Sequence, residues 1–237
     1  MSFLHAGTHR LSLARPLIMG IVNVTPDSFS DGGRLDDAQA AIRHALKLLE
    51  AGADILDVGG ESTRPGAAAV SVDEEMRRVL PVIKDLAGRG CVVSVDTMKP
   101  EVMRAALDAG AAMVNDVMAL RAPGALETVA ASDAAVCLMH MQGEPQRMQQ
   151  APSYTDVVEE VRHFLQDRVA ACEAAGIGRE RLVRGNPKEL ARARELLAEL
   201  ELRWTSRFSQ LDAILAEPTQ PMEQRCRSLP SLPIPKP

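Results

Sequence analysis

The chain alternates between short apolar runs and longer segments with an amphipathic helical pattern. Apolar runs rich in β-branched residues predict strands, whereas apolar residues that recur every three or four positions predict helices. The predicted strands are 17–23, 54–58, 91–95, 112–116 and 134–139, and residues 181–183 begin a sixth. The predicted helices are 36–51, 73–87, 100–109, 124–132 and 155–175. This order predicts an α/β fold with a parallel sheet covered by helices.

Two architectures share this order, the doubly wound sheet and the (β/α)8 TIM-type barrel. Polar residues stand at or just after successive predicted strand ends: Asn23, Asp57, Asp96, Asn115 and His140. A barrel collects such side chains at one rim, so their positions favour the barrel. A full barrel needs ~250 residues. Five strand–helix units and a fragment fit before residue 184, and we therefore expect an incomplete barrel.

The pattern changes at residue 184. The stretch from Lys188 to Glu217 lacks Gly and Pro, and apolar residues recur at intervals of seven: Leu190, Leu197, Trp204 and Leu211. This predicts a long amphipathic helix, or a helical hairpin, with coiled-coil character. The Pro-rich end predicts disorder. We therefore expect a barrel portion at 1–183, a helical segment at 184–217 and a disordered tail at 218–237.

Charge and cysteine usage narrow the function classes. The net charge is −5 and the isoelectric point is near 5.6, which argues against a nucleic-acid-binding surface. The four cysteines are widely spaced, so neither a zinc site nor a disulfide framework is expected. The N-terminus lacks a secretory pattern, and no apolar run is long enough to span a bilayer. These features predict a cytoplasmic protein with no nucleic-acid or membrane partner.

Two strings are distinctive. The first, MGIVNVTPDSFSDGG, runs from Met19 to Gly33 and passes from an apolar strand into a polar, Gly-rich loop. The second, DVGGESTRPG, runs from Asp57 to Gly66. Both strings resemble dihydropteroate synthase, the folate-pathway transferase that joins a dihydropterin pyrophosphate to p-aminobenzoate. The resemblance covers residues 1 to about 183 and implies a TIM barrel.

The resemblance implies roles for residues at the strand ends. It implies that Asp96 and Asn115 bind the pterin ring and that Met139 packs on it. It also implies that Asn23 contributes to a site for Mg²⁺ and pyrophosphate. The residues alone allow plainer interpretations, in which Asn23 satisfies a turn, Asp96 caps the helix before Pro100 and Asn115 is a buried structural amide.

The resemblance also assigns two loops. Asp27, Ser28 and Phe29 match the first flexible loop, which closes over the pyrophosphate. Thr63, Arg64 and Pro65 match the second loop, which contributes to the p-aminobenzoate site. From the residues alone, the first loop could be an ordinary surface turn and Arg64 a solvated cation.

Several further residues have weaker interpretations. Asp57 and Asp116 are candidates for orienting groups rather than pterin ligands, and Glu61 and Ser62 for support of the second loop. His140 lies between Met139 and Met141 without a second metal ligand at suitable spacing, which favours a structural role. The sequence contains no nucleophile–base motif, and we expect no catalytic residue in that sense.

The chain departs from the family pattern after Val183. Where the family has Leu-Asp-Pro-Gly, this chain has Arg184-Gly185-Asn186-Pro187. The later Ser-Arg-Lys and Arg-x-His segments, which carry cationic groups, have no counterpart. The sequence therefore predicts a synthase-type transferase with weak or no turnover.

Two other hypotheses stay open from the sequence. The chain could be a non-catalytic truncated or fused product, or a partner subunit that forms a homodimer through helix 188–217. It could also be another pterin-binding barrel, such as a methyltetrahydrofolate methyltransferase, although the Thr63-Arg64-Pro65-Gly66 loop suits a second substrate that bears a carboxylate.

Overall fold

The computed structural model describes residues 3–25, 34–62, 69–143 and 152–184. The chain divides into two compact units, Met1–Pro187 and Lys188–Pro237. The second unit lies outside the described residues, and with it the predicted helix 188–217 and the tail 218–237. All of the described helices and strands belong to the first unit.

A six-stranded parallel sheet forms the centre of this unit. Its strands lie in the order in which they occur in the chain, β3-β4-β5-β6-β7-β8. Sequential order is typical of a barrel wall, whereas a doubly wound sheet reverses direction at a switch point. The strands are β3 (Met19–Asn23), β4 (Ile55–Gly59), β5 (Val93–Asp96), β6 (Met113–Asp116), β7 (Ala135–Leu138) and β8 (Leu182–Arg184). The sheet is a partial (β/α) barrel, as the sequence predicts.

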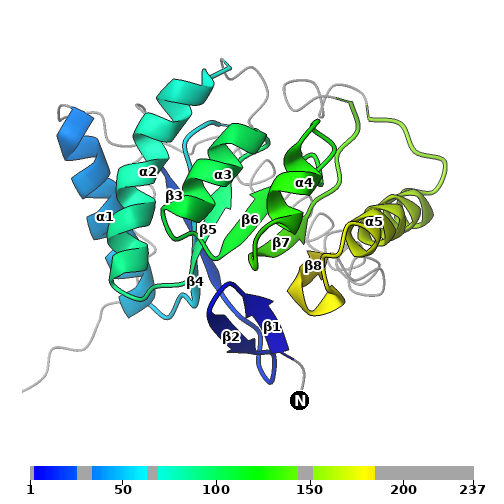
Figure 1. Cartoon of the computed structure of the whole chain (residues 1–237), viewed down its shortest axis with the longest axis horizontal. Coiled ribbons are helices and arrows are strands. Elements are labelled where there is room, and N and C mark those ends of the chain that lie inside the picture. The colour runs from blue at the N-terminus through cyan, green and yellow to red at the C-terminus, as the bar shows by residue number, and fades with distance from the viewer. Residues whose placement is uncertain (1–2, 26–33, 63–68, 144–151, 185–237) are drawn as a thin grey trace, which may run out of the picture. The chain divides into compact units, whose positions relative to one another are not determined.

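The helices that connect these strands cover one face of the sheet. Figure 1 shows α1, α2, α3 and α4 side by side in front of the strands, and each contacts the next. This one-sided cover is also the arrangement of a barrel. The helices are α1 (Arg34–Glu50), α2 (Val72–Gly88), α3 (Pro100–Asp108), α4 (Ala125–Ala130) and α5 (Val157–Ala174), and a 3₁₀ turn, η2 (Arg179–Arg181), precedes β8.

The observed boundaries lie within two residues of the predicted ones, and local chemistry explains them. Helix α5 begins at Val157 because the Asp156 side chain accepts the N–H groups of Val158 and Glu159, both at 3.1 Å. Helix α3 begins with Pro100 at its first position, where a missing N–H has no consequence.

Strand alternation separates two apolar regions. Leu56 and Val58 of β4, and Val93 and Val95 of β5, face the helices and are fully buried in the main core. Ile55 faces the other side and joins a smaller cluster at the amino ends of the strands. Residues two apart on a strand share a face. Asp57 and Gly59 therefore face the same side as Ile55, which is the inner side of the barrel wall.

A β-hairpin closes the amino end of the sheet, and the sequence pattern did not predict it. Strands β1 (Phe3–Ala6) and β2 (His9–Ser12) pair in antiparallel register, and Leu4 and Ala6 pack on the smaller cluster. Gly7 turns the hairpin with a φ of +57°, and its N–H donates to the carbonyl of Asp133 at 2.9 Å. Four-residue strands are too short to give a clear alternation, which explains the omission.

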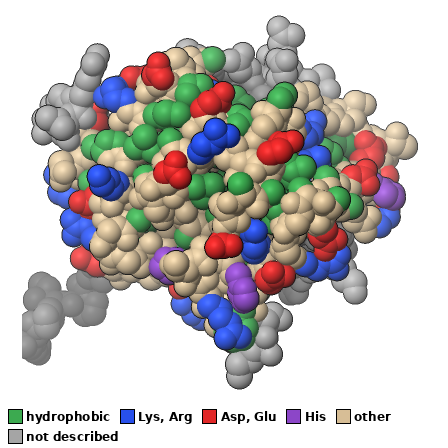
Figure 2. Space-filling view, in the orientation of Figure 1, with side chains coloured by type: hydrophobic (Ala, Val, Ile, Leu, Met, Phe, Trp, Pro, Cys, Tyr) green, Lys and Arg blue, Asp and Glu red, His purple; other side chains and the backbone are tan. Residues whose placement is uncertain are grey.

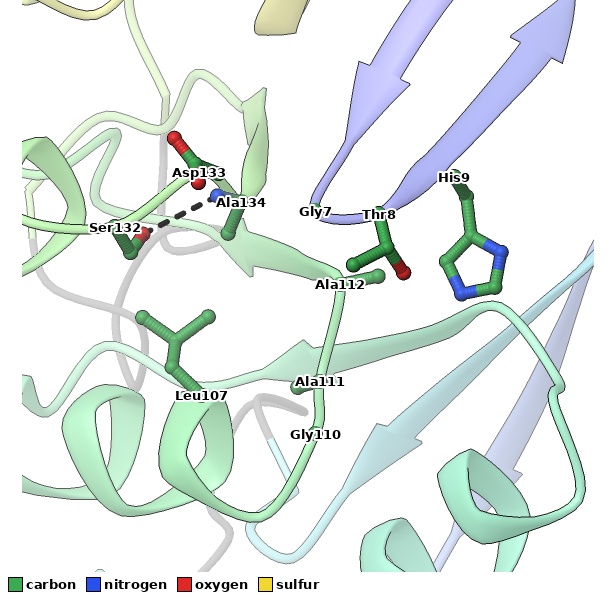
Figure 3. A pocket seen from close by; sticks show the side chains of 10 residues that line it. All are labelled: Gly7, Thr8, His9, Leu107, Gly110, Ala111, Ala112, Ser132, Asp133 and Ala134. Atoms are coloured by element: carbon green, nitrogen blue, oxygen red, sulfur yellow. Dashed lines mark hydrogen bonds between the residues drawn. The ribbon is translucent and has the colours of Figure 1, made fainter.

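A groove of about 270 Å³ lies beside the hairpin turn (Figure 3). Thr8 and His9 line one side of it, and residues of the α3–β6 and α4–β7 connections line the other. This groove lies at the amino ends of the strands. In barrels of this type the functional residues gather at the opposite, carboxyl ends.

Candidate functional site

Three polar side chains gather on the inner side of the sheet, near the carboxyl ends of β4, β5 and β6. Asp96 pairs in register with Gly59 on one neighbouring strand and with Asn115 on the other. The Asn115 Nδ2 donates to Asp57 Oδ2 at 2.9 Å. Asp57 and Asn115 are only 4% and 7% exposed. The structure thus brings together Asp57, Asp96 and Asn115, each of which the sequence analysis singled out.

This cluster contains two carboxylates, and its electrostatics are unfavourable for both charges. Burial raises the pKa of Asp96 to about 7, and the negative charges of Asp57, Asp116 and Glu75 add to this effect. Burial also raises the pKa of Asp57, and the nearby Ser94 hydroxyl and Asn115 amide partly offset that effect. An Asp96 carboxyl that titrates near neutrality can accept hydrogen bonds when ionised and donate one when protonated.

Some polar atoms of this cluster lack a partner in the described part of the chain and are therefore available to a ligand. Among the described residues, Asn115 Oδ1 is buried and has no hydrogen-bond partner. Asp57 Oδ1 and Ser94 Oγ are also buried without a described partner at hydrogen-bond distance, although the Ser94 hydroxyl is near enough to offset part of the rise in the pKa of Asp57. Buried polar atoms are nearly always paired, so unpaired ones call for an explanation. Because carboxylate and amide oxygens accept hydrogen bonds, a planar heterocycle with several N–H groups would supply the missing donors.

The helix-capping interpretation of Asp96 is wrong. The residue that precedes α3 is Lys99, whose side chain makes no capping hydrogen bond. The Thr97 Oγ1 instead accepts the N–H of Lys99 at 3.3 Å. Asp96 therefore does not cap helix α3, and its carboxylate faces the inner side of the sheet.

Asn23 ends strand β3 beside Gly59, its register partner on β4. A Cβ atom at Gly59 would lie 3.5 Å from Asp96 Oδ2 and 3.7 Å from Asn23 Oδ1. Glycine at this position therefore keeps open the space between the Asn23 amide and the Asp96 carboxylate. Asn23 is exposed, as a ligand-binding amide at a rim would be.

Asp116 points away from this cluster, although it follows Asn115 directly. It is fully buried, and its carboxylate accepts the N–H groups of Met118 at 2.8 Å and Leu120 at 2.7 Å. These bonds stabilise a turn in which Ala119 and Leu120 have φ values of 53° and 58°, a conformation that non-glycine residues seldom adopt. Asp116 thus holds the turn after β6.

Met139 and His140 follow strand β7. Met139 is 40% exposed, which leaves its side chain available to a ligand at the rim. The His140 ring packs edge-on against Phe164 of α5, with centroids 4.9 Å apart, and lies 6.0 Å from the Tyr154 ring. Burial lowers the pKa of His140, and the positive charge of Arg121 lowers it further. These contacts support the structural interpretation of His140.

The two predicted loops lie outside the described residues. These are Asp27, Ser28 and Phe29 of the first loop and Thr63, Arg64 and Pro65 of the second. The described ends of the second loop are Glu61 and Ser62 on one side and residues 69–70 on the other. Sequence reasoning missed two residues beside them, Lys99 and Glu75, which form an ion pair with one another at 2.6 Å. No short motif joins these residues, because they are 24 positions apart.

A metal centre built from protein side chains alone is not present in the described part of the chain, where no three His, Cys, Asp or Glu residues are grouped. The helix-covered face in Figure 2 shows acidic and basic side chains interspersed, with neither sign forming a continuous patch. Among the described helices, none combines the length and the apolar character needed to cross a membrane.

Comparison with known proteins gives one consistent result. The model of the family described as "Pterin binding enzyme" matches residues 19–184. The chain is 52% identical to dihydropteroate synthase of Escherichia coli (strain K12) over 195 residues, which are 80% of this chain and 69% of that protein. It is 52% identical to the Neisseria meningitidis serogroup C enzyme over 75% of this chain and 64% of the enzyme.

Solved structures agree. The Burkholderia cenocepacia dihydropteroate synthase complexed with 7,8-dihydropteroate is 46% identical, with a TM-score of 0.68 over 77% of this chain and 62% of that chain. The Xanthomonas albilineans enzyme with 4-aminobenzoic acid is 58% identical, with a TM-score of 0.68 over 74% and 62%. The chain thus spans about two thirds of the length of these relatives.

Proposed function

Because the chain belongs to the family of pterin-binding enzymes and, within it, to the dihydropteroate synthases, we propose that it binds 6-hydroxymethyl-7,8-dihydropterin pyrophosphate and joins it to p-aminobenzoate. The product would be 7,8-dihydropteroate. The observation that supports this proposal most strongly is the cluster of half-buried Asp96 with buried Asp57 and Asn115 on the inner side of a partial barrel, in which the Asn115 amide oxygen has no partner among the described residues.

The pterin end of the site has three principal contacts in this proposal. Asp96 accepts N–H groups of the heterocycle through its carboxylate, and Asn115 offers both a donor and an acceptor to the ring edge. Met139 packs on the ring face. Asp57 holds the Asn115 amide through the 2.9 Å hydrogen bond and so orients it.

In this proposal, two loops bind p-aminobenzoate and the pyrophosphate group. Thr63, Arg64 and Pro65 contribute to the p-aminobenzoate site, where a guanidinium can pair with the benzoate carboxylate. Asp27, Ser28 and Phe29 belong to the loop that closes over the pyrophosphate. Both assignments rest on the family and on the residues themselves.

Mg²⁺ is the cofactor that the family implies, and Asn23 is the residue that would help to hold it. Its amide oxygen is a hard ligand, and Mg²⁺ commonly takes one or two protein ligands together with substrate phosphate oxygens. The open space beside Gly59 fits such a shared arrangement. When bound, Mg²⁺ supplies positive charge that stabilises the pyrophosphate.

The reaction is a displacement at the pterin methylene carbon. The C–O bond to pyrophosphate breaks, a C–N bond to the p-aminobenzoate nitrogen forms, and that nitrogen loses a proton. No protein nucleophile is needed, because the substrate brings its own leaving group. The protein's task is to orient both substrates and stabilise the departing charge.

We expect turnover to be weak or absent. The family's cationic segments have no counterpart after Val183, and those groups stabilise the leaving pyrophosphate. A second candidate function, a non-catalytic pterin-binding subunit, is favoured by one observation. Arg184-Gly185-Asn186-Pro187 stands where the family has Leu-Asp-Pro-Gly. Both functions place the protein in the cytoplasm with small-molecule ligands.

A coupled assay for pyrophosphate release separates these functions. Purified monodisperse protein is given dihydropterin pyrophosphate with and without p-aminobenzoate. Release that depends on p-aminobenzoate and is lost in Asp96→Ala supports the synthase. Pterin binding without release supports the non-catalytic subunit. Asp108→Ala, in an exposed residue at the end of α3, is the matched control.

A further inference from the structure

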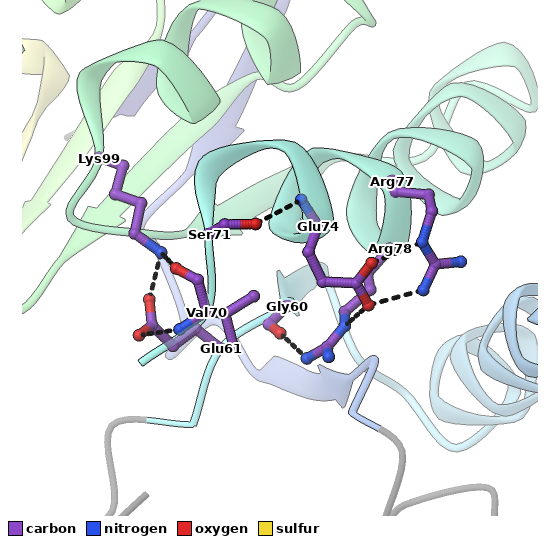
Figure 4. A network of polar contacts seen from close by, with 8 residues as sticks. All are labelled: Gly60, Glu61, Val70, Ser71, Glu74, Arg77, Arg78 and Lys99. Carbon is purple, nitrogen blue, oxygen red and sulfur yellow. Dashed lines mark hydrogen bonds and ion pairs between the residues drawn. The ribbon is translucent and has the colours of Figure 1, made fainter. Parts of the chain in front are cut away.

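Lys99 forms hydrogen bonds with residues at both ends of the segment between Gly60 and Ser71. The Lys99 ammonium donates to Glu61 Oε2 and to the carbonyl of Val70, each at 2.6 Å (Figure 4). It also donates to Glu75 Oε2 at 2.6 Å. The three ionic side chains are largely withdrawn from water, with 18% of Lys99, 11% of Glu61 and 1% of Glu75 exposed.

Glu61 makes a second connection across the same gap. Its Oε1 accepts the N–H of Val70 at 3.1 Å, while its Oε2 binds Lys99. Glu61 and Val70 are nine residues apart, so these contacts hold the two described ends of the segment together. Holding two such ends together has an entropic cost, and the contacts between them offset it.

The start of the segment is also held from the side of helix α2. Arg78 Nη1 donates to the carbonyl of Gly60 at 2.8 Å, and Arg78 Nε donates to Glu74 Oε1 at 2.9 Å (Figure 4). A Cβ atom at Gly60 would lie 2.8 Å from Val79 Cγ1. Only glycine allows the chain to leave β4 this close to the helix.

The charges of Lys99, Glu61 and Glu75 do not cancel. Two carboxylates share one ammonium, and one oxygen of Glu75, Oε1, has no partner among the described residues. Burial lowers the pKa of Lys99, but the hydrogen bonds to Glu61 and Glu75 outweigh that effect and raise it overall. Buried ion pairs often stabilise less than apolar packing would, and their best-attested use is to specify one arrangement.

We propose that Lys99 is a positioning residue, which fixes the base of the 62–69 segment through Glu61 and Val70. Lys99 is three residues after Asp96, and Glu61 is two residues after Gly59. The contact therefore couples the end of β5, at the pterin cluster, to the loop that follows β4. The consequence for p-aminobenzoate rests on the proposed function, because Thr63, Arg64 and Pro65 belong to this segment.

Three variants test the proposal. Lys99→Met removes the ammonium and leaves the carboxylates of Glu61 and Glu75 without the cation they share, so this variant is expected to fold less stably. Glu61→Ala removes the hydrogen bonds of Glu61 to Lys99 and to the Val70 N–H but keeps the Lys99–Glu75 pair. Lys99→Arg preserves the charge and should rescue part of the effect. Arg77→Met, which breaks an exposed pair with Glu74 on the same helix, and Glu101→Ala are matched controls.

The first readout is hydrogen exchange at the Val70 amide, which needs no ligand. In Glu61→Ala we expect this amide to exchange at least about tenfold faster, because it loses its acceptor. In Lys99→Met it should also exchange faster, because Glu61 and the Val70 carbonyl lose the ammonium that joins them, and Lys99→Arg should restore part of the protection. The controls should exchange at the wild-type rate. An unchanged rate at Val70 in Glu61→Ala, or in folded Lys99→Met, would overturn the proposal.

The second readout separates positioning from general destabilisation. Affinity for p-aminobenzoate, measured with pyrophosphate present, should fall about tenfold in Glu61→Ala, which corresponds to ~1.4 kcal/mol. Affinity for dihydropterin pyrophosphate should stay within about twofold. Equal losses for both ligands would overturn the positioning role. If wild type binds no p-aminobenzoate, the proposed function fails at its second substrate, and the exchange rate at Val70 alone decides whether Lys99 and Glu61 fix the base.

Discussion

Replacement of Asp96 by Asn should raise the free energy of unfolding at neutral and alkaline pH. Below about pH 3.8 it should leave this free energy nearly unchanged. The folded protein raises the pKa of Asp96 from 3.8 to about 7, mainly by burial. Between about pH 4 and pH 7 the folded form therefore holds a proton that the unfolded chain has lost. As a result, wild type loses stability as pH rises through this window, whereas the neutral amide of Asn does not.

The size of this stability difference follows from the interval between the two pKa values of Asp96. The interval spans about three pH units, and each unit corresponds to ~1.4 kcal/mol, which gives about 4 kcal/mol as an upper bound. Water that reaches the side chain and relaxation around it lower this figure. We expect Asp96→Asn to exceed wild type by roughly 2–4 kcal/mol at pH 8, by about 1 kcal/mol at pH 4.5 and by less than about 0.5 kcal/mol at pH 3.5.

Urea unfolding followed by far-ultraviolet circular dichroism at several pH values measures this difference. The difference between the two proteins is the useful quantity, because the other carboxylates titrate in both. Asp108→Asn, at an exposed position, should differ from wild type by less than about 0.5 kcal/mol at each pH. A difference between Asp96→Asn and wild type that is constant across pH, or that grows in acid, would refute the reasoning.

Three other outcomes are expected from the contacts of this chain. Asp116→Ala should lower the free energy of unfolding by about 2–4 kcal/mol in urea titrations, because two N–H groups in a turn with positive φ lose their acceptor; a loss under about 0.5 kcal/mol would contradict this role. Leu4→Ala should cost about 2–4 kcal/mol by the same assay, since Leu4 packs beneath the sheet; an unchanged midpoint would mean that the hairpin does not support the sheet. If helix 188–217 forms a homodimer, sedimentation should show concentration-dependent dimers that Leu197→Ser with Leu211→Ser abolishes, and a monomeric wild type would exclude it.

The fold was predictable from the sequence because its signals are local. Up to residue 184, each apolar β-branched run became a strand and each amphipathic segment a helix, and Asn23, Asp57, Asp96 and Asn115 lie near the carboxyl ends of their strands. Asp96 and Asn115 were singled out by their positions at predicted strand ends and by the family resemblance. The hairpin of β1 and β2 was missed, because four residues are too few to show a period.

Other features depend on residues that are far apart in the sequence. The raised pKa of Asp96 arises from burial and from charges contributed by three other elements. Lys99 meets Glu61 across 38 positions and Glu75 across 24. Asp116 and Asn115 are neighbours in the sequence, yet alternation sends one to the turn and the other to the candidate site. Only the folded arrangement makes such relations visible.

The most direct test of the central claim is calorimetric titration of the purified protein with dihydropterin pyrophosphate. Wild type should bind, and Asn115→Ala should bind about 10–100-fold more weakly, because a buried pairing with the ring edge is lost. Asp108→Ala should bind as wild type does. Failure of folded wild type to bind the pterin, or equal binding by Asn115→Ala, would contradict the assignment of the Asp57, Asp96 and Asn115 cluster as a pterin site.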